Sequence, residues 1–434
     1  MTSLAVLLSP AGRELLARLR GEDVTAGQAL RLAEQLRGSY PPDLVAAALT
    51  EQALRMSARA KFGRAQEMLF TRDGLEQASS EQAAAHSARR LRGFAAVADL
   101  CCGIGGNLSA LAANSRVLAV DRDLTSLEFA RHNAAVSGAP GPVLAVCANV
   151  RQLVADSPQG AGGRIEAAFI DPARRAGGRR LRAGVSEPPM DWCLRLTDWV
   201  PAVGIKAAPG LPLELVPPGW EAEFLAVGRG LKEALLWSPA LASAPRRATI
   251  LPTADTTDDT TADTTGDTTG ATTADTTGGS TAPVYTLTAE PGSPVPVAAP
   301  GEFLLDPNPS VTRAGLVEDL ARRLGAWKID PMIAFLATDR EVSTPFARTL
   351  RVLESMPWHE KQAARRLREL GIGAADIRRR GLAGDVDLIR RRLGLRGEGA
   401  ATIVLTRRED RPWGLICTPV GSPGGPRPGR DQPA

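Results

Sequence analysis

The 434-residue chain is 44% hydrophobic and carries a formal net charge of +4, so it is long enough for two or three domains, and its mild basic excess is compatible with nucleic acid without establishing it. Its five cysteines form no Cys-x-x-Cys pair and it has only three histidines, which argues against a disulfide framework, a metal site and a Cys/His nucleophile. No stretch approaches the roughly 18 apolar residues of a membrane span, and the apolar run at 3–9 is too short for a signal peptide, so we expect a cytoplasmic protein.

Residues 1–60 are predicted to form a small helical domain. Ser9-Pro10 places an N-cap before a proline at the first helical position, which predicts a helix to about Leu19. Further helices are expected over 25–36 and from Pro41-Pro42 to about 61. We expect this domain to cover one side of a catalytic sheet; direct contact with nucleic acid is the alternative.

The chain is organised around residues 96–107, Ala-Val-Ala-Asp-Leu-Cys-Cys-Gly-Ile-Gly-Gly-Asn. The apolar run just before the turn predicts a buried parallel strand, and an amphipathic helix begins near Asn107. The turn carries Gly103, Gly105 and Gly106, which let backbone N–H groups approach a ligand closely. Strand, glycine turn and helix indicate a nucleotide-binding α/β fold, although such a turn also occurs for packing alone.

Polar residues end the strands of the predicted sheet. Asp121 follows a strand at 116–120, about twenty residues after the glycine turn, where a carboxylate can accept hydrogen bonds from both ribose hydroxyls. Asn149 follows the strand predicted at 143–147, and Asp171 follows the strand predicted at 167–170. Asp99 lies near the end of the first strand. The turn differs from the Gly-x-Gly-x-x-Gly of nicotinamide-binding proteins, so an adenosine cofactor other than a dinucleotide is expected.

The rest of the sheet is predicted beyond residue 199. A fifth strand is expected at 200–205 and ends at Lys206, one of only five lysines among the 52 basic residues. Strands at 222–227 and 233–237 are expected to pair as a hairpin. The stretch 253–283, rich in Thr, Asp and Gly, has almost nothing apolar to bury and is predicted to be a disordered insert in a further hairpin.

Residues 300–420 are predicted to form a second folded unit. Its expected helices are 309–324, 361–370, 374–380 and 385–393, and its expected strands are 402–405 and 414–417. Arginines gather in this unit, Arg379 and Arg391 among them, and they either contact phosphates or form an arginine-rich solvated helix surface. The tail 421–434, rich in Pro and Gly, is predicted to be disordered.

The stretches DLCCGIGGNLSALA, VLAVDRD and ARHNAAVSG resemble the motifs of class I S-adenosylmethionine-dependent methyltransferases, and especially the trimethylguanosine-synthase type. Nearly the whole chain outside the insert resembles bacterial methyltransferases with a C-terminal THUMP-like domain, in KFGRAQEMLFTRDGLEQAS, GIKAAPGL, KEALLWS and LDPNPSVTRAGLVEDLA. The resemblance implies a Rossmann-like seven-stranded α/β sheet, an N-terminal helical domain and a C-terminal α+β THUMP-like domain. The implied domains are 1–60, helical; 61–252 plus 284–299, methyltransferase; and 300–420, THUMP-like.

The cofactor that the resemblance implies is S-adenosyl-L-methionine. Asn149 stands where such enzymes usually have an acidic residue, but its side-chain oxygen can still accept from the adenine amino group. In this family the segment before the first strand often closes over the cofactor, so Phe62, Phe70 and Thr71 either do this or pack beneath the first helix. Cofactor contacts are expected from Gln77, Asp99, Gly103, Gly105, Asn107, Asp121 and Asn149.

Catalysis is expected from Asp171, Pro172 and Lys206. The Asp171 carboxylate, or the next two backbone carbonyls, can accept from an amino N–H and aim the nitrogen lone pair at the methyl group. The family pattern Asp/Asn-Pro-Pro-aromatic also stacks the base; here the motif is Asp-Pro-Ala-Arg, and Arg174 or Trp192 would have to stack instead. Lys206 is expected to donate to substrate or phosphate.

The leading hypothesis is methylation of a base nitrogen in structured RNA, tRNA or rRNA. The alternatives are a non-catalytic RNA-binding protein that retains the cofactor fold, and a small-molecule methyltransferase. No metal and no membrane is expected among the partners, and the RNA species and the oligomeric state stay open. RNA contacts are expected from Arg174, Arg175, Arg179, Arg180, Arg379 and Arg391.

Overall fold

The computed structural model describes residues 3–156, 165–173, 175–176, 179–180, 186–253 and 283–420. The chain divides into two compact units, which we call unit 1 (Met1–Ala222 and Glu233–Ser243) and unit 2 (Glu223–Lys232 and Ala244–Ala434). The division passes through two consecutive strands, β8 (Glu221–Val227) and β9 (Gly230–Trp237). The predicted insert and tail lie outside the described residues, apart from residues 253 and 283 at the ends of the insert.

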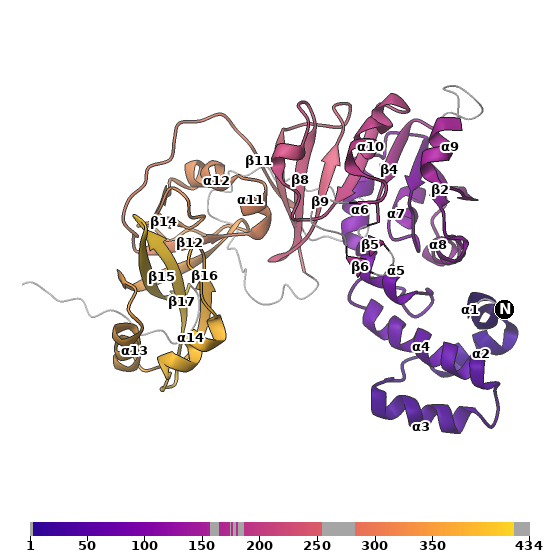
Figure 1. Ribbon diagram of the computed structural model, residues 1–434, viewed down its shortest axis with the longest axis horizontal. Coiled ribbons are helices and arrows are strands. Elements are labelled where there is room, and N and C mark those ends of the chain that lie inside the picture. Colours follow the sequence, from indigo (N-terminus) through magenta and orange to yellow (C-terminus); the bar gives the residue numbers. More distant parts are fainter. Residues whose placement is uncertain are drawn as a thin grey trace, which may run out of the picture. The chain divides into compact units, whose positions relative to one another are not determined.

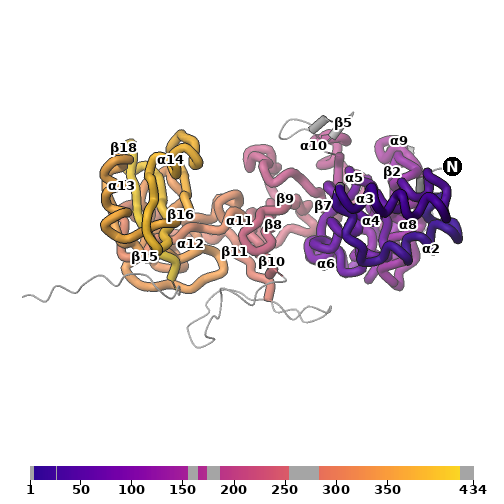
Figure 2. Tube along the Cα trace, turned by 90° about the horizontal axis from the view of Figure 1, so that it is seen from below, coloured from indigo at the N-terminus to yellow at the C-terminus, as the bar shows by residue number. Residues whose placement is uncertain are grey.

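Unit 1 begins with four helices, α1 (Ser3–Leu8), α2 (Pro10–Arg18), α3 (Ala26–Leu36) and α4 (Pro42–Ala58). The three helices predicted from sequence are present, and the apolar run at 3–9 adds α1. The predicted N-cap of α2 is formed, since Ser9 Oγ accepts a hydrogen bond from Gly12 N at 3.0 Å. Within unit 1, α3 runs beside α4 (Figures 1 and 2).

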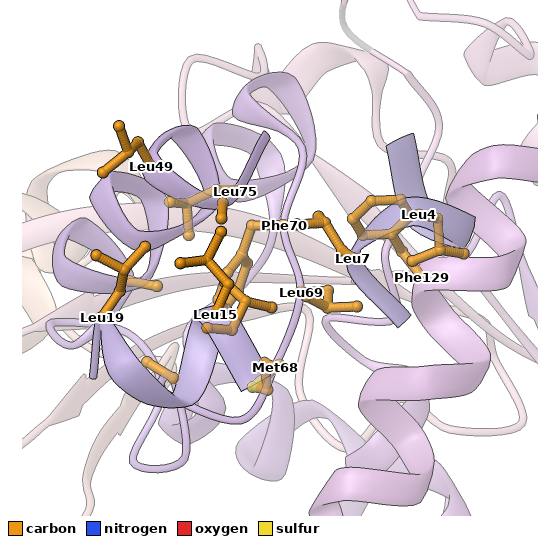
Figure 3. Close-up of a cluster of buried hydrophobic side chains, with 14 of the residues drawn as sticks. Leu4, Leu7, Leu15, Leu19, Leu49, Met68, Leu69, Phe70, Leu75 and Phe129 are labelled. Carbon is orange, nitrogen blue, oxygen red and sulfur yellow. The ribbon is translucent and has the colours of Figure 1, made fainter. Parts of the chain in front are cut away.

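These helices bury one hydrophobic cluster against the sheet domain of unit 1. Leucines of α1, α2 and α4 meet Met68, Leu69 and Phe70 of the following segment and Phe129 from a helix of the sheet domain (Figure 3). Because burying each such side chain contributes roughly 1.5–3 kcal/mol, the cluster fixes the segment around residue 70 in place. Two short helices, α5 (Arg72–Gln77) and α6 (Glu81–Arg89), follow that segment and lead into the sheet.

The sheet of unit 1 has five parallel strands in the hydrogen-bonded order β3-β2-β1-β4-β7, and residues 234–237 of β9 pair antiparallel with β7. Their bounds are β1 (Ala96–Leu100), β2 (Arg116–Asp121), β3 (Val143–Cys147), β4 (Ala167–Ile170) and β7 (Ala202–Ala207). The helices between them are α7 (Leu108–Ala112), α8 (Leu124–Ser137), α9 (Val150–Asp156) and α10 (Met190–Leu194). The hairpin of β8 and β9 completes the predicted seven-stranded, Rossmann-like α/β order.

Parallel strands carry their functional residues at one edge of the sheet. Strands β1, β4 and β7 are buried along their whole length, as expected for strands covered on both faces. Asp99 pairs in register with Ala119 and Phe169, so the carboxyl ends of β1, β2 and β4 lie together. The fifth strand runs two residues further than predicted, so Lys206 lies inside β7 rather than after it.

Unit 2 contains β10 (Arg246–Leu251) and β11 (Tyr285–Thr288), an antiparallel pair that confirms the predicted further hairpin. Its second sheet has seven strands in the order β13-β14-β12-β15-β18-β17-β16. Their bounds are β12 (Phe303–Pro307), β13 (Trp327–Lys328), β14 (Leu336–Thr338), β15 (Ala347–Pro357), β16 (Ile372–Arg379), β17 (Gly399–Arg408) and β18 (Arg411–Pro419). Helices α13 (Glu360–Glu369) and α14 (Val386–Leu393) pack on each other and on β16 (Figure 1).

Two predicted elements of this unit are wrong. The helix expected at 309–324 is two helices, α11 (Pro309–Arg313) and α12 (Val317–Leu324), because Gly315 turns the chain with φ of +66°. The helix expected at 374–380 belongs to β16, whose backbone pairs with β17 in parallel. Tertiary pairing overrides the helix propensity of Ala374 and Ala375. No helix in the described part of the chain is long and apolar enough to cross a bilayer.

Candidate active site

The glycine turn after β1 has the backbone shape that a ligand-binding loop needs. Cys101, Gly103 and Gly105 all have positive φ, of 59°, 54° and 87°. A Cβ at Gly105 would meet Ala130 Cα at 3.1 Å, and a Cβ at Gly106 would meet Ala78 Cβ at 3.2 Å, so those two glycines allow close packing. At Gly103 a Cβ would meet nothing within 4 Å, so this glycine faces open space.

Asp121 lies at the tip of β2, and the backbone holds its carboxylate. Gly103 N donates to Oδ2 at 2.8 Å and Asp123 N donates to Oδ1 at 2.9 Å. The side chain is half-buried, so each oxygen keeps a lone pair for a further donor. This geometry joins the glycine turn to β2 and presents a fixed anion to the cavity beside it.

Two buried acceptors at the glycine turn have no partner. Neither oxygen of Asp99, which is 1% exposed, has a hydrogen-bond donor in the described part of the chain, and the same holds for Asn107 Oδ1. Burial raises the pKa of Asp99 well above its ordinary value, and the charges of Asp171 and Asp121 raise it further. A buried carboxylate without a donor is costly, so this position fits a cationic ligand group such as an ammonium.

The segment that leads into the sheet covers the turn. Phe62 and Phe70 are buried in the N-terminal cluster with ring centroids 5.7 Å apart, so these two rings pack rather than face a ligand. Thr71 caps α5, accepting from Gly74 N at 3.1 Å. Gly74 lies against the glycine turn, since a Cβ there would meet Ile104 Cγ2 at 2.5 Å.

Buried Asn133 of α8 connects this segment to the turn. Its Nδ2 donates to the carbonyls of Leu69 and Ile104 at 2.9 and 3.0 Å, and its Oδ1 accepts from Leu69 N at 2.9 Å. Asn133 satisfies three backbone groups at once, so it fixes the distance between the covering segment and the glycine turn. Asn133 lies in the stretch ARHNAAVSG, but no local pattern in the sequence signals this role, because its partners are 29 and 64 residues away.

These elements enclose a cavity of about 660 Å³, large enough for a nucleoside-sized ligand. The candidate residues that line it are Gln77, Gly103, Asn107, Asp121, Asn149 and Asp171, together with Thr71. Asp99, Gly105, Pro172 and Lys206 are absent from its lining. Asn149 Oδ1 already accepts from Arg151 N at 3.0 Å as the cap of α9, which leaves it one further lone pair.

Asp171 at the tip of β4 is held by a buried chain of polar groups. Lys206 Nζ donates to Asp171 Oδ2 at 2.7 Å and to Gln77 O at 3.2 Å, and Glu233 Oε2 lies 3.7 Å from the same ammonium. Ser79 Oγ in turn donates to Glu233 Oε2 at 2.9 Å. Lys206 is 3% exposed, so its ammonium holds the Asp171 carboxylate from the buried side of the sheet edge. It does not reach a phosphate at the surface.

The chain after Asp171-Pro172 is clamped before the basic loop begins. Ala173 and Glu187 exchange two backbone hydrogen bonds of 2.8 and 2.9 Å, and Arg151 Nη2 lies 3.5 Å from Glu187 Oε2. The Ala173 carbonyl is therefore occupied, and of the two carbonyls considered from sequence only that of Pro172 lacks a donor from another described residue. Trp192 on α10 is absent from the cavity lining.

The predicted RNA-binding arginines fall into two places. Arg174 lies outside the described residues; Arg175, Arg179 and Arg180 have only their backbone described, in β5 (Arg175–Ala176) and β6 (Arg179–Arg180). In unit 2, Arg379 is exposed on β16 and Arg391 is exposed on α14. The first group belongs to unit 1 and the second to unit 2.

The cysteines next to the cavity are poor nucleophiles. Burial raises the pKa of the Cys101 and Cys102 thiols far above neutrality, and that of Cys193 to about 12. Within the described ranges no group of three or more His, Cys, Asp or Glu side chains could hold a metal ion.

Comparisons with known proteins agree with this geometry. Residues 94–172 match the family model "RNA cap guanine-N2 methyltransferase", residues 347–419 match "THUMP domain-like", and residues 1–58 match a domain of unknown function. Two uncharacterized S-adenosylmethionine-dependent methyltransferases of Mycobacterium tuberculosis, from strains CDC 1551 and H37Rv, are each 34% identical over 357 residues, 78% of this chain and 84% of theirs. The crystal structure of a putative methyltransferase from Porphyromonas gingivalis W83 has a TM-score of 0.67 at 20% identity, covering 94% of this chain and 98% of that one.

Proposed function

The chain belongs to the S-adenosylmethionine-dependent methyltransferases, and from that premise we propose that it methylates a nitrogen of a base in structured RNA. Its cofactor is S-adenosyl-L-methionine, which supplies an electrophilic methyl group. The observation that carries the proposal is the placement of Asp171. This carboxylate lines the cavity, and one of its oxygens is fixed on the buried Lys206 ammonium.

The residues around the cavity fit that cofactor. Asp99 lies behind the lining, and its buried carboxylate, which has no hydrogen-bond donor among the described residues, is assigned to an ammonium group; Asn107 Oδ1, in the lining, is a further unpaired acceptor. Asp121, fixed by Gly103 N and Asp123 N, suits the two hydroxyls of a ribose. Gln77 and Asn149 line the same cavity and are assigned to the cofactor with them.

Asp171 and Pro172 are assigned to the methyl acceptor. Asp171 Oδ1 and the Pro172 carbonyl receive no hydrogen bond from another described residue, so both can accept from the N–H groups of an amino group. Two such bonds orient the nitrogen so that its lone pair faces the cavity, and a carboxylate stabilises the positive charge that the nitrogen gains during transfer. The released proton passes from the nitrogen to solvent or to Asp171.

RNA is favoured as the substrate by two independent features. The family model matched at 94–172, which ends on Asp171-Pro172, is named for guanine-N2 methylation of RNA caps, and position N2 of guanine is an exocyclic amino group. The model matched at 347–419 is described as THUMP domain-like, and unit 2 carries exposed arginines that suit phosphates. Both features are consistent with a methyl acceptor that is the amino group of a base in a cytoplasmic RNA.

The proposal is tested by offering labelled cofactor to several acceptor pools. Purified protein is incubated with S-adenosylmethionine tritiated in its methyl group and with RNA, DNA or a small-molecule extract from cells that lack this gene. We expect label in RNA, and its loss in Asp171→Ala. Label confined to the small-molecule extract would establish a small-molecule methyltransferase instead.

A further inference from the structure

Unit 2 contains a second polar cavity, which is separate from the cofactor cavity. We call it the arginine cavity; its volume is about 330 Å³. It is lined by Arg229, Arg348, Arg378, Arg379 and Arg380, together with Asp306, Pro309 and Phe335. Five arginines thus line a space that has a single acidic residue in its lining.

Asp306 organises the inner part of the arginine cavity. Its side chain is only 4% exposed, and it accepts from Arg229 Nη2 and Arg380 Nη2 at 2.8 Å each, with Arg378 Nη1 at 3.6 Å. Arg380 also lies over the Phe335 ring, 4.9 Å from its centroid. These contacts make Arg229 and Arg380 the rigid floor of the cavity.

The curvature of the sheet brings these residues together. Strand β16 is separated from β12 by β17, β18 and β15 in the hydrogen-bonded order, yet Arg378 and Arg380 reach Asp306 of β12. The cavity therefore takes Arg348 from β15, Arg378 and Arg379 from β16, Arg380 just after β16, and Arg229 from the connection between β8 and β9.

The positive charge of the cavity is not balanced. Among the residues that the structure describes, Asp376 is the one further acidic partner of these arginines, at 2.8 Å from Arg378 and 3.7 Å from Arg348, so five arginines meet two carboxylates there. Arg379 is exposed and has no ion pair or hydrogen bond with any other residue that the structure describes. Burial lowers the pKa of Arg229 and Arg380, and the neighbouring arginines lower it further.

A purely structural cluster would not need this arrangement. One buried carboxylate is neutralised by one or two arginines, and each additional guanidinium adds repulsion. Arg348 and Arg379 keep N–H donors for a further acceptor, and planar guanidinium groups match the oxygens of a phosphate in pairs.

We propose that the arginine cavity is a phosphate-binding site, and that it binds a phosphate of the substrate RNA. Arg348 and Arg379 are the groups that bind the phosphate, while Arg229 and Arg380 hold Asp306 and shape the floor. The RNA part of this inference rests on the proposed function; the phosphate part does not. The phosphate belongs either to the RNA backbone or to a 5′ end.

The test uses the full chain and leaves the floor residues unchanged. The variants are Arg348→Ala/Arg379→Ala, Arg379→Lys, and Arg396→Ala as the control, since Arg396 is an exposed arginine of unit 2 outside the cavity. Binding of inorganic pyrophosphate is measured by calorimetry. Binding of a fluorescein-labelled RNA 20-mer, with either a 5′ phosphate or a 5′ hydroxyl, is measured by anisotropy at several salt concentrations, and tritium transfer to RNA is followed in parallel.

We expect the double variant to weaken pyrophosphate and RNA binding at least about tenfold and to lower the salt slope of RNA binding by about 2. Arg379→Lys loses part of the affinity because it keeps the charge without the planar fork, and Arg396→Ala retains pyrophosphate affinity. Equal affinity for the two 5′ ends assigns the site to a backbone phosphate, and preference for the 5′ phosphate assigns it to the terminus.

Two results would overturn the inference, and they have different consequences for the proposed function. If the double variant binds pyrophosphate and RNA as tightly as the wild type while methyl transfer to RNA continues, the site is wrong and the proposed function stands. If the wild type binds and methylates no RNA, the RNA assignment fails together with the proposed function, and pyrophosphate binding alone then decides whether the cavity is a phosphate site.

Discussion

Replacing Lys206 by methionine is the change that most directly tests the buried network behind Asp171. The ammonium lies 2.7 Å from Asp171 Oδ2 and 3.7 Å from Glu233 Oε2, and Glu233 is 3% exposed. Methionine keeps the apolar stem of lysine, is one atom shorter and carries no charge. The variant therefore leaves Glu233 as a buried carboxylate whose one hydrogen-bond donor among the described residues is Ser79.

The size of the effect follows from these distances. At an effective dielectric of 20, the two attractions are worth roughly 6 and 4.5 kcal/mol before dehydration is subtracted. Breaking a buried pair from one side costs about 3–5 kcal/mol because the partner charge stays buried. For a domain of about 150–250 residues this lowers Tm by roughly 6–20 °C. Adding Glu233→Gln removes the unpaired buried charge, and this second change should restore at least about 1 kcal/mol of the free energy of unfolding.

Thermal unfolding and methyl transfer are measured for Lys206→Met, for Lys206→Met/Glu233→Gln and for Lys232→Met, an exposed lysine of β9. The control should stay within about 0.5 kcal/mol of the wild type. Because Lys206 does not line the cofactor cavity, Lys206→Met should lower kcat and leave the cofactor Kd within a few-fold. If Lys206→Met is no less stable than Lys232→Met, or keeps full kcat, the network does not orient Asp171.

Three further predictions concern the cofactor and pH. Asp121→Ala should raise the cofactor Kd at least about 30-fold by calorimetry, because two charge-assisted hydrogen bonds to ribose are lost; an unchanged Kd would place the ribose elsewhere. Because burial raises the pKa of Asp99, its carboxyl takes up a proton at a higher pH than usual, so cofactor affinity should fall as the pH is lowered, and Asp99→Asn should bind weakly with no such dependence. Burial raises the pKa of Glu51 to about 7, so the folded state keeps a proton that the unfolded chain loses near pH 4.5. Stability should therefore fall by about 2 kcal/mol between pH 4.5 and 7, and Glu51→Gln should flatten this profile in denaturant titrations at both pH values.

Local patterns were enough to predict the sheet of unit 1. The short apolar strands are separated by single helices, and each ends in a polar residue, so Asp121, Asn149 and Asp171 could be placed at one edge from spacing alone. The Ser9-Pro10 helix start and the glycine turn are likewise signals carried by a few adjacent residues. The resemblance to methyltransferases then supplied the cofactor.

The network around Asp171 could not be predicted, because its members are far apart in sequence. Ser79 and Glu233 are 154 residues apart, and only the pairing of β9 with β7 brings Glu233 near Lys206. Lys206 was noticed because lysine is rare in this chain, but its burial, and hence its action from behind Asp171, depends on the packed sheet.

In unit 2 the errors came from helix-forming residues in strands. The Ala-Ala-Asp-Ile-Arg-Arg-Arg run favours a helix locally, yet it pairs with β17, and its alternation sends Arg378 and Arg380 to Asp306 while Arg379 stays exposed. All three arginines nevertheless line the arginine cavity, where β16 lies beside Asp306 of β12. A helical interpretation would have spread these arginines around a surface, so the cavity could be recognised only in the folded chain.

The most direct test of the central claim identifies the labelled atom. RNA that has received tritiated methyl groups from the wild-type protein is digested to nucleosides, and the labelled nucleoside is identified by chromatography and mass spectrometry. The account predicts label on an exocyclic base nitrogen, and none when Asp171→Asn replaces the wild type. Label on a ribose 2′ oxygen or on a base carbon, or equal labelling by Asp171→Asn, would contradict the assignment of Asp171 and Pro172 to an amino acceptor.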